Sequence, residues 1–276
     1  MPSRDLDVFQ GQLGTYQVIE TEDGSRTLKS PFFKEACHSL NGAYSETLHN
    51  YLKPNKIEKL WSGKDLSELN ILEVGFGLGV GVQVTYDVLS AHEKTHKKLN
   101  YVALEIDEGL IEYARKNVDL CNDLFPGFNE LKRYEMQSLV YYRAEKDQSS
   151  LTILIGDARK TLPEFIKTKM CPKFHVIYQD AFSPRKNPTL WTYEWFELLA
   201  TTSHPLASLS TYCASVSPRK ALLKAGFRPQ RLKGMGFKRE ITQAVLDPRS
   251  PQDPSLEQSL INSKAITLSD NNINDY

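Results

Sequence analysis

The sequence predicts a doubly wound α/β fold built on a mainly parallel sheet. From residue 71 onward, five short apolar runs alternate with segments of helical spacing, and a glycine-rich turn follows the first run. Apolar runs of this length suit buried strands, and their alternation with helices produces βαβ units. The predicted strands cover residues 71–76, 101–106, 151–156, 176–182 and 209–214. The predicted helices lie near residues 79–91, 107–121, 158–168, 189–200 and 217–225.

The first 70 residues form an N-terminal extension to this alternating pattern. The runs YQVIE and SRTL read as two strands of a hairpin, with Asp23-Gly24 as the turn dipeptide. Further along, an apolar face that includes Tyr44 and Leu48 repeats with helical spacing. We therefore expect the extension, residues 1–70, to contain a hairpin and a helix.

Residues 71–246 form the main domain, with one insertion and one tail. Residues 122–150 interrupt the alternation, and we expect an inserted segment that is partly helical. Residues 237–246 suit a final, antiparallel strand. From Asp247 the sequence is polar and rich in Pro, Ser and Asn, which predicts a disordered tail over residues 247–276.

The composition excludes several classes of protein. With 40% hydrophobic and 25% charged residues, most of the chain should be globular. The formal net charge is zero, although the part before Asp247 has 32 basic and 29 acidic residues. The four cysteines form no CxxC pair, so neither a disulfide framework nor a zinc site is expected. No stretch approaches the length of an apolar membrane span, and we expect a cytoplasmic protein.

The run EVGFGLG at residues 73–79 indicates a ligand-binding turn between a strand and a helix. Its glycines allow a sharp turn and a close approach of a ligand to the main chain. The helix that follows presents free backbone N–H groups. A tight turn without a ligand is the alternative. The residues expected to contact a cofactor here are Glu73, Gly75, Phe76, Gly77 and Gly79.

Acidic residues follow the next two predicted strands. Glu105 ends the second strand, where a carboxylate can accept hydrogen bonds from both ribose hydroxyls of a dinucleotide or an adenosyl ligand. Asp157 follows the third strand, where nucleoside methyltransferases place an acid against the adenine amino group, although it can also cap the next helix. We expect Glu105, Asp157 and Ala158 to bind S-adenosylmethionine.

The fourth predicted strand ends in the loop QDAFSPRKNP, residues 179–188. The pattern of an acid, an aromatic residue and prolines resembles the loop of methyltransferases that act on amino groups. In those enzymes the polar side chain holds the attacking amine and the ring packs on the base. The corresponding catalytic residues are Asp180, Phe182 and Pro184; a helix cap and a core phenylalanine are the alternative.

Several segments, in this order, resemble the bacterial tRNA 5-aminomethyl-2-thiouridine methyltransferase family, which comprises the MnmC methyltransferase domain and its free-standing MnmD form. The segments are EDGSRTL, FF followed by NGAYSETLHNYLKPN, ILEVGFGLG, YVALE, GDA, QDAFSPRKNPTLWTYEWF, STYCAS followed by RKALLKAGF, and GFKRE. The likeness covers about residues 15–245, and DAFSPRKNPTLWT is its most specific part. The sequence departs from the family at residues 78–81, near Cys37-His38, and before the fifth strand.

The resemblance implies a Rossmann-like class I methyltransferase. Such an enzyme would transfer a methyl group from S-adenosylmethionine to the aminomethyl nitrogen of a modified wobble uridine in tRNA. Asp180 would hold the amine and accept its proton, and Phe182 would pack against the uracil. Two-domain members of the family carry a flavin oxidoreductase domain; this chain is too short to contain one, so a separate oxidoreductase in the same pathway would be a partner.

A basic stretch between Ser217 and Ile241 favours a nucleic-acid substrate, since phosphate binding needs such clusters. An ordinary solvated surface is the alternative. The residues expected to contact tRNA are Arg185, Lys186, Arg219, Lys220, Lys238 and Arg239. Three other functions stay open: an aminopropyltransferase, a methyltransferase for a small-molecule amine, and a non-catalytic tRNA-binding relative.

Overall fold

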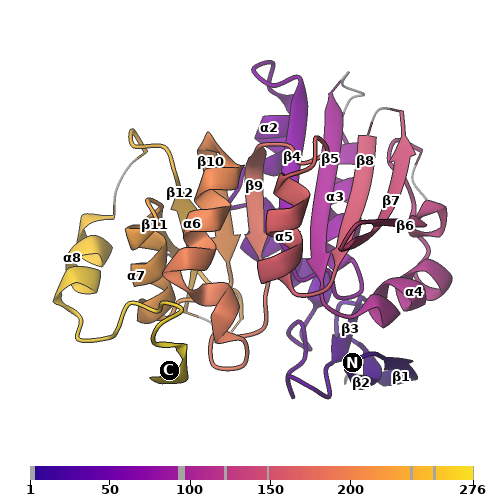
Figure 1. The fold of residues 1–276 in the computed structure, drawn as a ribbon, viewed down its shortest axis with the longest axis horizontal. Coiled ribbons are helices and arrows are strands. Elements are labelled where there is room, and N and C mark those ends of the chain that lie inside the picture. The colour runs from indigo at the N-terminus through magenta and orange to yellow at the C-terminus, as the bar shows by residue number, and fades with distance from the viewer. Residues whose placement is uncertain are drawn as a thin grey trace.

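The computed structural model describes residues 4–92, 97–120, 123–147, 149–236, 239–250 and 253–275. A nine-stranded sheet forms its centre, in the order β11-β12-β10-β9-β4-β5-β8-β7-β6 (Figure 1). The parallel strands are β10 (Ser203–Thr211), β9 (Phe174–Gln179), β4 (Glu68–Val74), β5 (Lys98–Glu105) and β8 (Ser149–Ile155). The predicted α/β class is confirmed. Chain order reverses between β4 and β9, and open α/β sheets bind ligands at such a switch point.

Helices cover both faces of the sheet (Figure 1). One layer contains α2 (Ile57–Ser62), α3 (Val80–Ser90) and α4 (Glu108–Asn117); the other contains α5 (Ala158–Ile166), α6 (Tyr193–Thr202) and α7 (Val216–Lys224). Successive strand residues pack on opposite faces of the sheet: Ile71 packs against the first layer and Leu72 against the second. Burial on both faces explains why these strands are continuous apolar runs.

The inserted segment is a β-hairpin, so the expectation of a partly helical insertion over residues 122–150 is wrong in the main. Strand β6 (Lys132–Met136) pairs with β7 (Leu139–Lys146), which extends the sheet antiparallel to β8. The 3₁₀ turn η2 (Phe128–Glu130) precedes it. Tyr141 and Tyr142 pack into opposite cores, which is the two-residue period of a strand.

The N-terminal extension forms a small three-stranded sheet. The predicted hairpin is confirmed as β2 (Gly14–Glu20) and β3 (Arg26–Lys29), and β1 (Arg4–Gly11) adds an unexpected third strand. Helix α1 (Ala43–Thr47) and the π-helical turn η1 (Leu48–Leu52) follow. In Figure 1 the small sheet lies beyond the carboxyl ends of the central strands. The extension therefore sits where ligands of such sheets bind.

A buried carboxylate, Asp107, ties this extension to the main domain. It caps α4 by accepting from the Gly109 N–H at 2.8 Å. It also accepts from the backbone N–H groups of Gln12 and Leu13, each at 2.8 Å, and from the Tyr16 hydroxyl at 2.9 Å. One side chain thus fixes the extension directly beside the end of β5.

The C-terminal part completes the sheet and then turns back onto it. Strand β12 (Glu240–Val245) runs antiparallel to β10 and to β11 (Arg228–Lys233), as expected for residues 237–246 apart from 237–238, which lie outside the described residues. The expected disorder of residues 247–276 is corrected: the described part contains α8 (Pro254–Asn262) and the 3₁₀ turn η4 (Ile273–Asp275). Buried leucines explain the order; they are Leu256, Leu260 and Leu268.

Asp253 should therefore contribute measurably to stability. Its carboxylate accepts from the Leu256 N–H at 2.9 Å and pairs with Arg231 at 3.0 Å. We expect Asp253→Ala to lower the free energy of unfolding by about 1 kcal/mol, the usual cost of losing such a cap. Asp253→Asn keeps the cap and should stay within a few tenths of wild type, since exposed ion pairs contribute little. Urea unfolding of both variants checks this; a disordered tail would leave both unchanged.

None of the helices in the described residues combines the length and apolar character that crossing a bilayer requires.

Candidate active site

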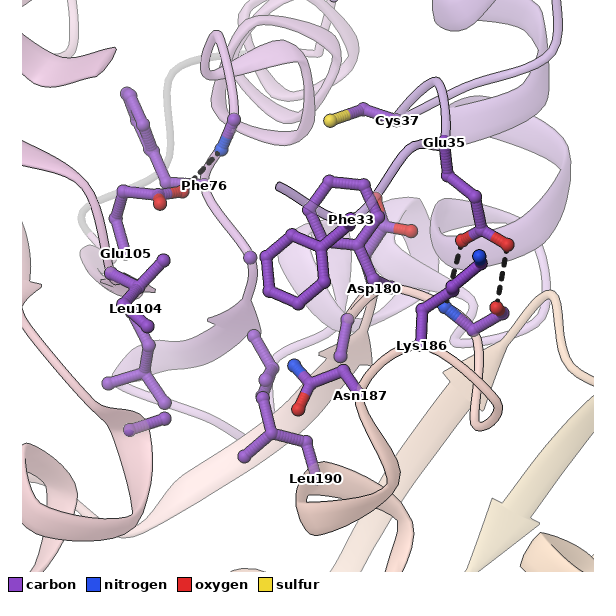
Figure 2. A pocket seen from close by; sticks show the side chains of 18 of the residues that line it. Phe33, Glu35, Cys37, Phe76, Leu104, Glu105, Asp180, Lys186, Asn187 and Leu190 are labelled. Atoms are coloured by element: carbon purple, nitrogen blue, oxygen red, sulfur yellow. Dashed lines mark hydrogen bonds between the residues drawn. The ribbon is translucent and has the colours of Figure 1, made fainter. Parts of the chain in front are cut away.

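A cavity of about 760 Å³ opens at the carboxyl ends of the parallel strands, beneath the N-terminal extension. Its size falls within the usual range for small-molecule and cofactor sites. The loops after β4, β5, β8 and β9 line one side, and residues of the extension line the other (Figure 2). The predicted site residues that line it are Glu73, Gly75, Phe76, Gly77, Glu105, Asp157, Ala158, Asp180, Phe182 and Lys186.

The glycine-rich turn brings backbone close to the cavity. Gly75 has φ 100°, and a Cβ there would lie 2.7 Å from the Asp180 carbonyl oxygen. Gly77 has φ 57°, but a Cβ there would come no nearer than 4.0 Å to Cys37 Sγ, so this glycine borders open space. Gly79 does not line the cavity: a Cβ would collide with the Phe128 ring, so its smallness serves packing.

Glu105 is held by the main chain at the end of β5, with only 7% of its surface exposed. Its Oε2 accepts from the Gly77 N–H and its Oε1 from the Asp107 N–H, each at 3.0 Å. Burial raises the pKa of this carboxyl to about 7, against the lowering effect of those hydrogen bonds. Each oxygen has a further lone pair, so the ionised group can accept hydrogen bonds from a ligand diol.

Glu73, near the end of β4, is a second buried carboxyl in the cavity. Only 3% of it is exposed, and burial together with the negative charge of Asp180 raises its pKa well above the usual range. A Cβ on Gly81 would collide with the Glu73 carboxylate, so the glycine makes room for this side chain. The site thus keeps a carboxyl that favours its neutral form.

Asp157 fulfils the capping role considered from the sequence and also lines the cavity. Its Oδ1 accepts from the Arg159 N–H at 3.0 Å at the start of α5. The side chain is exposed toward the cavity, next to the buried Ala158. Capping therefore does not prevent a contact with a ligand at this edge.

Asp180 follows β9 and faces the extension (Figure 2). The Tyr51 hydroxyl donates to its Oδ1 at 2.5 Å, and His38 Nε2 lies 3.7 Å from its Oδ2. Its backbone N–H donates to the Val74 carbonyl at 3.1 Å. This carboxylate is thus fixed at the switch point of the sheet.

The residue before it, Gln179, anchors the whole loop. This fully buried amide donates to the Leu190 carbonyl at 2.8 Å and accepts from Trp195 Nε1 at 3.1 Å. Trp191 Nε1 donates to the Phe182 carbonyl at 2.8 Å. Tryptophan N–H groups usually find a partner when buried, and here they hold the first part of the loop, at Gln179 and Phe182.

Phe182 lines the cavity. Phe33, from the extension, stacks on it with centroids 4.2 Å apart and an interplanar angle of 21°. Ser183 beside it donates its hydroxyl to Glu35 at 2.7 Å. Pro184, also expected to be catalytic, is buried and does not line the cavity.

Two of the basic residues expected to contact tRNA are structural instead. Arg219 is 4% exposed and donates to Thr242 Oγ1 at 2.8 Å, to Glu240 at 3.0 Å and to the Ile241 carbonyl at 3.3 Å. Lys220 Nζ donates to two carbonyls of the segment after α8. Spacing on a helix could not reveal these partners, because they lie on β12 and the tail.

The other basic residues differ in position. Lys186 lies at the cavity, whereas Arg185 is exposed next to it without lining it. Arg239 is exposed. Lys238 lies outside the described residues. Among the expected tRNA contacts that the structure describes, only Lys186 lines the cavity.

The contribution of the N-terminal extension to the cavity was not predicted from the sequence. Residues from it that line the cavity include Phe33, Glu35, Cys37, His38, Glu46 and Tyr51. Tyr51 was visible only as part of an apolar helix face. The FF run and the departure near Cys37-His38 were signals, but neither showed which loop the side chains meet.

Comparison with known proteins supports one family. Residues 129–247 match a family model described as S-adenosyl-L-methionine-dependent methyltransferase. Over 241 residues the chain is 31% identical to the tRNA 5-methylaminomethyl-2-thiouridine biosynthesis bifunctional protein MnmC of Ectopseudomonas mendocina, covering 82% of this chain and 34% of that protein. MnmC2 from Aquifex aeolicus superposes with a TM-score of 0.71 at 27% identity, covering 93% of this chain and 79% of that one.

The chain is similar over most of its length to relatives named MnmC, and the comparisons support the MnmC methyltransferase-domain family. It is therefore an S-adenosylmethionine-dependent methyltransferase, as predicted. The chain spans about a third of the length of the bifunctional MnmC relatives it matches. A probable spermidine synthase from Corynebacterium glutamicum also superposes, with a TM-score of 0.53 at 13% identity over 95% of this chain and 89% of that one, which shows a shared fold only.

Proposed function

We propose that this enzyme, as a member of the MnmC methyltransferase-domain family, methylates the aminomethyl nitrogen of a modified wobble uridine in tRNA. The observation that carries the proposal is the Asp180 carboxylate, fixed at the switch point beside the Phe182 ring. A carboxylate there can accept a hydrogen bond from an amine, and a ring beside it can pack on a pyrimidine. The bifunctional MnmC relatives, whose names concern biosynthesis of tRNA 5-methylaminomethyl-2-thiouridine, support the same substrate.

The cavity fits a cationic cofactor and a cationic substrate. Among the described residues that line it are six carboxyl groups and one lysine, Lys186. The carboxyl groups belong to Glu35, Glu46, Glu73, Glu105, Asp157 and Asp180. Both a sulfonium and an alkylammonium carry positive charge, so this field attracts both.

S-adenosylmethionine, when bound, supplies an electrophilic methyl group on a sulfonium. We assign the ribose hydroxyls to Glu105, the adenine edge to Asp157 and Ala158, and the close backbone approach to Gly75 and Gly77. Asp180 would hold and align the amine for methyl transfer and would accept the proton that the amine loses. Alignment of this kind contributes several kcal/mol to lowering the barrier.

The affinity for S-adenosylmethionine should weaken as the pH falls below about 7. The pKa of Glu105 is raised to about 7 by burial, and ribose hydroxyls donate to the ionised form. Below that pH the carboxyl is protonated in the free protein, so binding must release a proton and Kd rises by up to about tenfold per pH unit. Calorimetry from pH 5.5 to 8.5 measures this dependence.

Glu105→Gln is the matched control for that prediction. It cannot titrate, so its affinity should be lower by about 1–3 kcal/mol at pH 8 and change little with pH. A flat pH dependence in the wild-type protein would remove Glu105 from the cofactor contacts.

The acceptor itself is tested by mass spectrometry of wobble nucleosides. Bulk tRNA that carries 5-aminomethyl-2-thiouridine is incubated with the protein and S-adenosylmethionine, then digested. We expect a mass gain of one methyl group on that nucleoside. Methylation of free alkylamines or polyamines instead of tRNA would favour the small-molecule alternative, which the acidic cavity also suits. Cofactor binding without any transfer would favour a non-catalytic relative.

A further inference from the structure

The N-terminal extension contacts both oxygens of Asp180. Tyr51 donates to Oδ1, and His38 Nε2 faces Oδ2 at 3.7 Å. The side chains of His38 and Asp180 are 8% and 12% exposed. Both contacts come from a part of the chain far from Asp180 in sequence, so they exist only in the assembled site.

Thr27 on β3 sets the orientation of the His38 ring. Its Oγ1 accepts from the His38 backbone N–H at 3.1 Å and lies 3.2 Å from His38 Nδ1. Thr27 is 1% exposed, so its own hydroxyl hydrogen needs an acceptor within the protein, and Nδ1 is in reach. A hydroxyl that donates to Nδ1 leaves the proton of the neutral ring on Nε2, which faces Asp180.

Asp180 needs such a donor because its surroundings are acidic. Its negative charge acts on the buried Glu73, on Cys37, and on the hydroxyls of Tyr51 and Tyr212. The groups that face this part of the cavity are Glu35, Cys37, Glu73, Glu105, Lys186 and Tyr212. Neighbouring carboxylates favour the protonated form of an acid, and a protonated Asp180 cannot take a proton from the amine.

We propose that His38 is a positioning residue for methyl transfer, which keeps Asp180 ionised and directed at the acceptor amine through its Nε2–H. The inference rests on the proposed function of Asp180. Thr27 orients the ring, Nε2 of the ring lies 3.7 Å from Oδ2, and Tyr51 donates to Oδ1. The extension is then part of the acceptor site rather than a separate cover.

Two substitutions separate this role from simple packing. Gln can place an amide N–H near the position of Nε2, whereas Leu cannot. We expect His38→Leu to lower the single-turnover rate at neutral pH by about 10- to 100-fold, within the range for groups that act on a proton transfer. The acidic limb of its pH–rate profile should move to higher pH, because Asp180 protonates more readily without the donor. His38→Gln should stay within a few-fold of wild type with little movement of the limb.

Controls keep the outcome specific. S-adenosylmethionine affinity should be unchanged in both variants, and His92→Gln, at a partly exposed histidine beside Glu58, should behave as wild type. A rate loss in His38→Leu with an unmoved profile, or an equal loss in His38→Gln, would overturn the inference, since either points to packing alone.

An NMR measurement tests the contact even if tRNA proves not to be the substrate. Ring nitrogen shifts should identify the Nε2–H tautomer of His38 in the wild-type protein and should change in Asp180→Asn. If the wild-type protein methylates no tRNA while these shifts hold, the proposed acceptor fails but the His38–Asp180 contact stands. A proton on Nδ1, insensitive to Asp180→Asn, would refute the inference itself.

Discussion

Asp180→Asn should reduce methyl transfer by about 10²- to 10⁴-fold, the range for loss of a general base. The amide keeps the size of the side chain and can still accept from the Tyr51 hydroxyl, but it cannot take a proton from the amine. The residual rate should rise more steeply with pH, because bulk solvent must then supply the neutral amine. Single-turnover rates across pH, with S-adenosylmethionine saturating, measure both effects.

Cofactor affinity serves as the internal control for that experiment. The proposed contact of Asp180 is to the acceptor, so Kd for S-adenosylmethionine should change little. If Asp180 only shapes the loop, Asn would preserve turnover at neutral pH, and the assignment of a proton acceptor would be wrong.

Arg219→Ala should destabilise the fold by about 2–4 kcal/mol, the scale for removing charge-assisted hydrogen bonds and leaving their acceptors unpaired. The guanidinium joins α7 to β12 through Thr242, Glu240 and the Ile241 carbonyl. Glu240 is partly solvated, so the loss of stability should be smaller than for breaking a fully buried ion pair. Urea unfolding monitored by circular dichroism measures the change.

Arg239→Ala is the matched variant for nucleic-acid binding. Arg239 is exposed, so its loss should leave stability within about 0.5 kcal/mol of wild type. If it contacts phosphate, the salt dependence of tRNA binding should become shallower by about one charge. A stable Arg219→Ala protein with weakened tRNA binding would reverse these two assignments.

The cavity residues at the strand ends could be predicted because they follow from the local pattern of apolar runs. Gly75, Glu105, Asp157 and Asp180 each follow a buried apolar run, and parallel strands place such positions at one edge. Their convergence in one cavity therefore needed no knowledge of long-range contacts. The roles assigned to each remain proposals for experiment.

The missed features depend on distant partners. Pairing of β6 with β7 sets the exposed Tyr134 opposite the buried Tyr141, seven residues later, and a seven-residue spacing also suits a helix when taken alone. Arg219 reads as a surface charge until β12 covers it. Leu256 and Leu260 lie four residues apart on one face of α8, but two leucines do not predict burial without the surface they pack on. In each case tertiary contact, rather than local preference, decides the outcome.

The sequence separation of the site's contacts has a consequence for the order of folding. The Tyr51–Asp180 bond closes a loop of 129 residues, and the Glu35–Ser183 bond closes one of 148. Closing loops of this length costs chain entropy before any contact offsets it, so non-local pairings form slowly. The central sheet, whose neighbouring strands are closer in sequence, can assemble first, and the acceptor half of the site then matures when the N-terminal residues reach a surface that already exists.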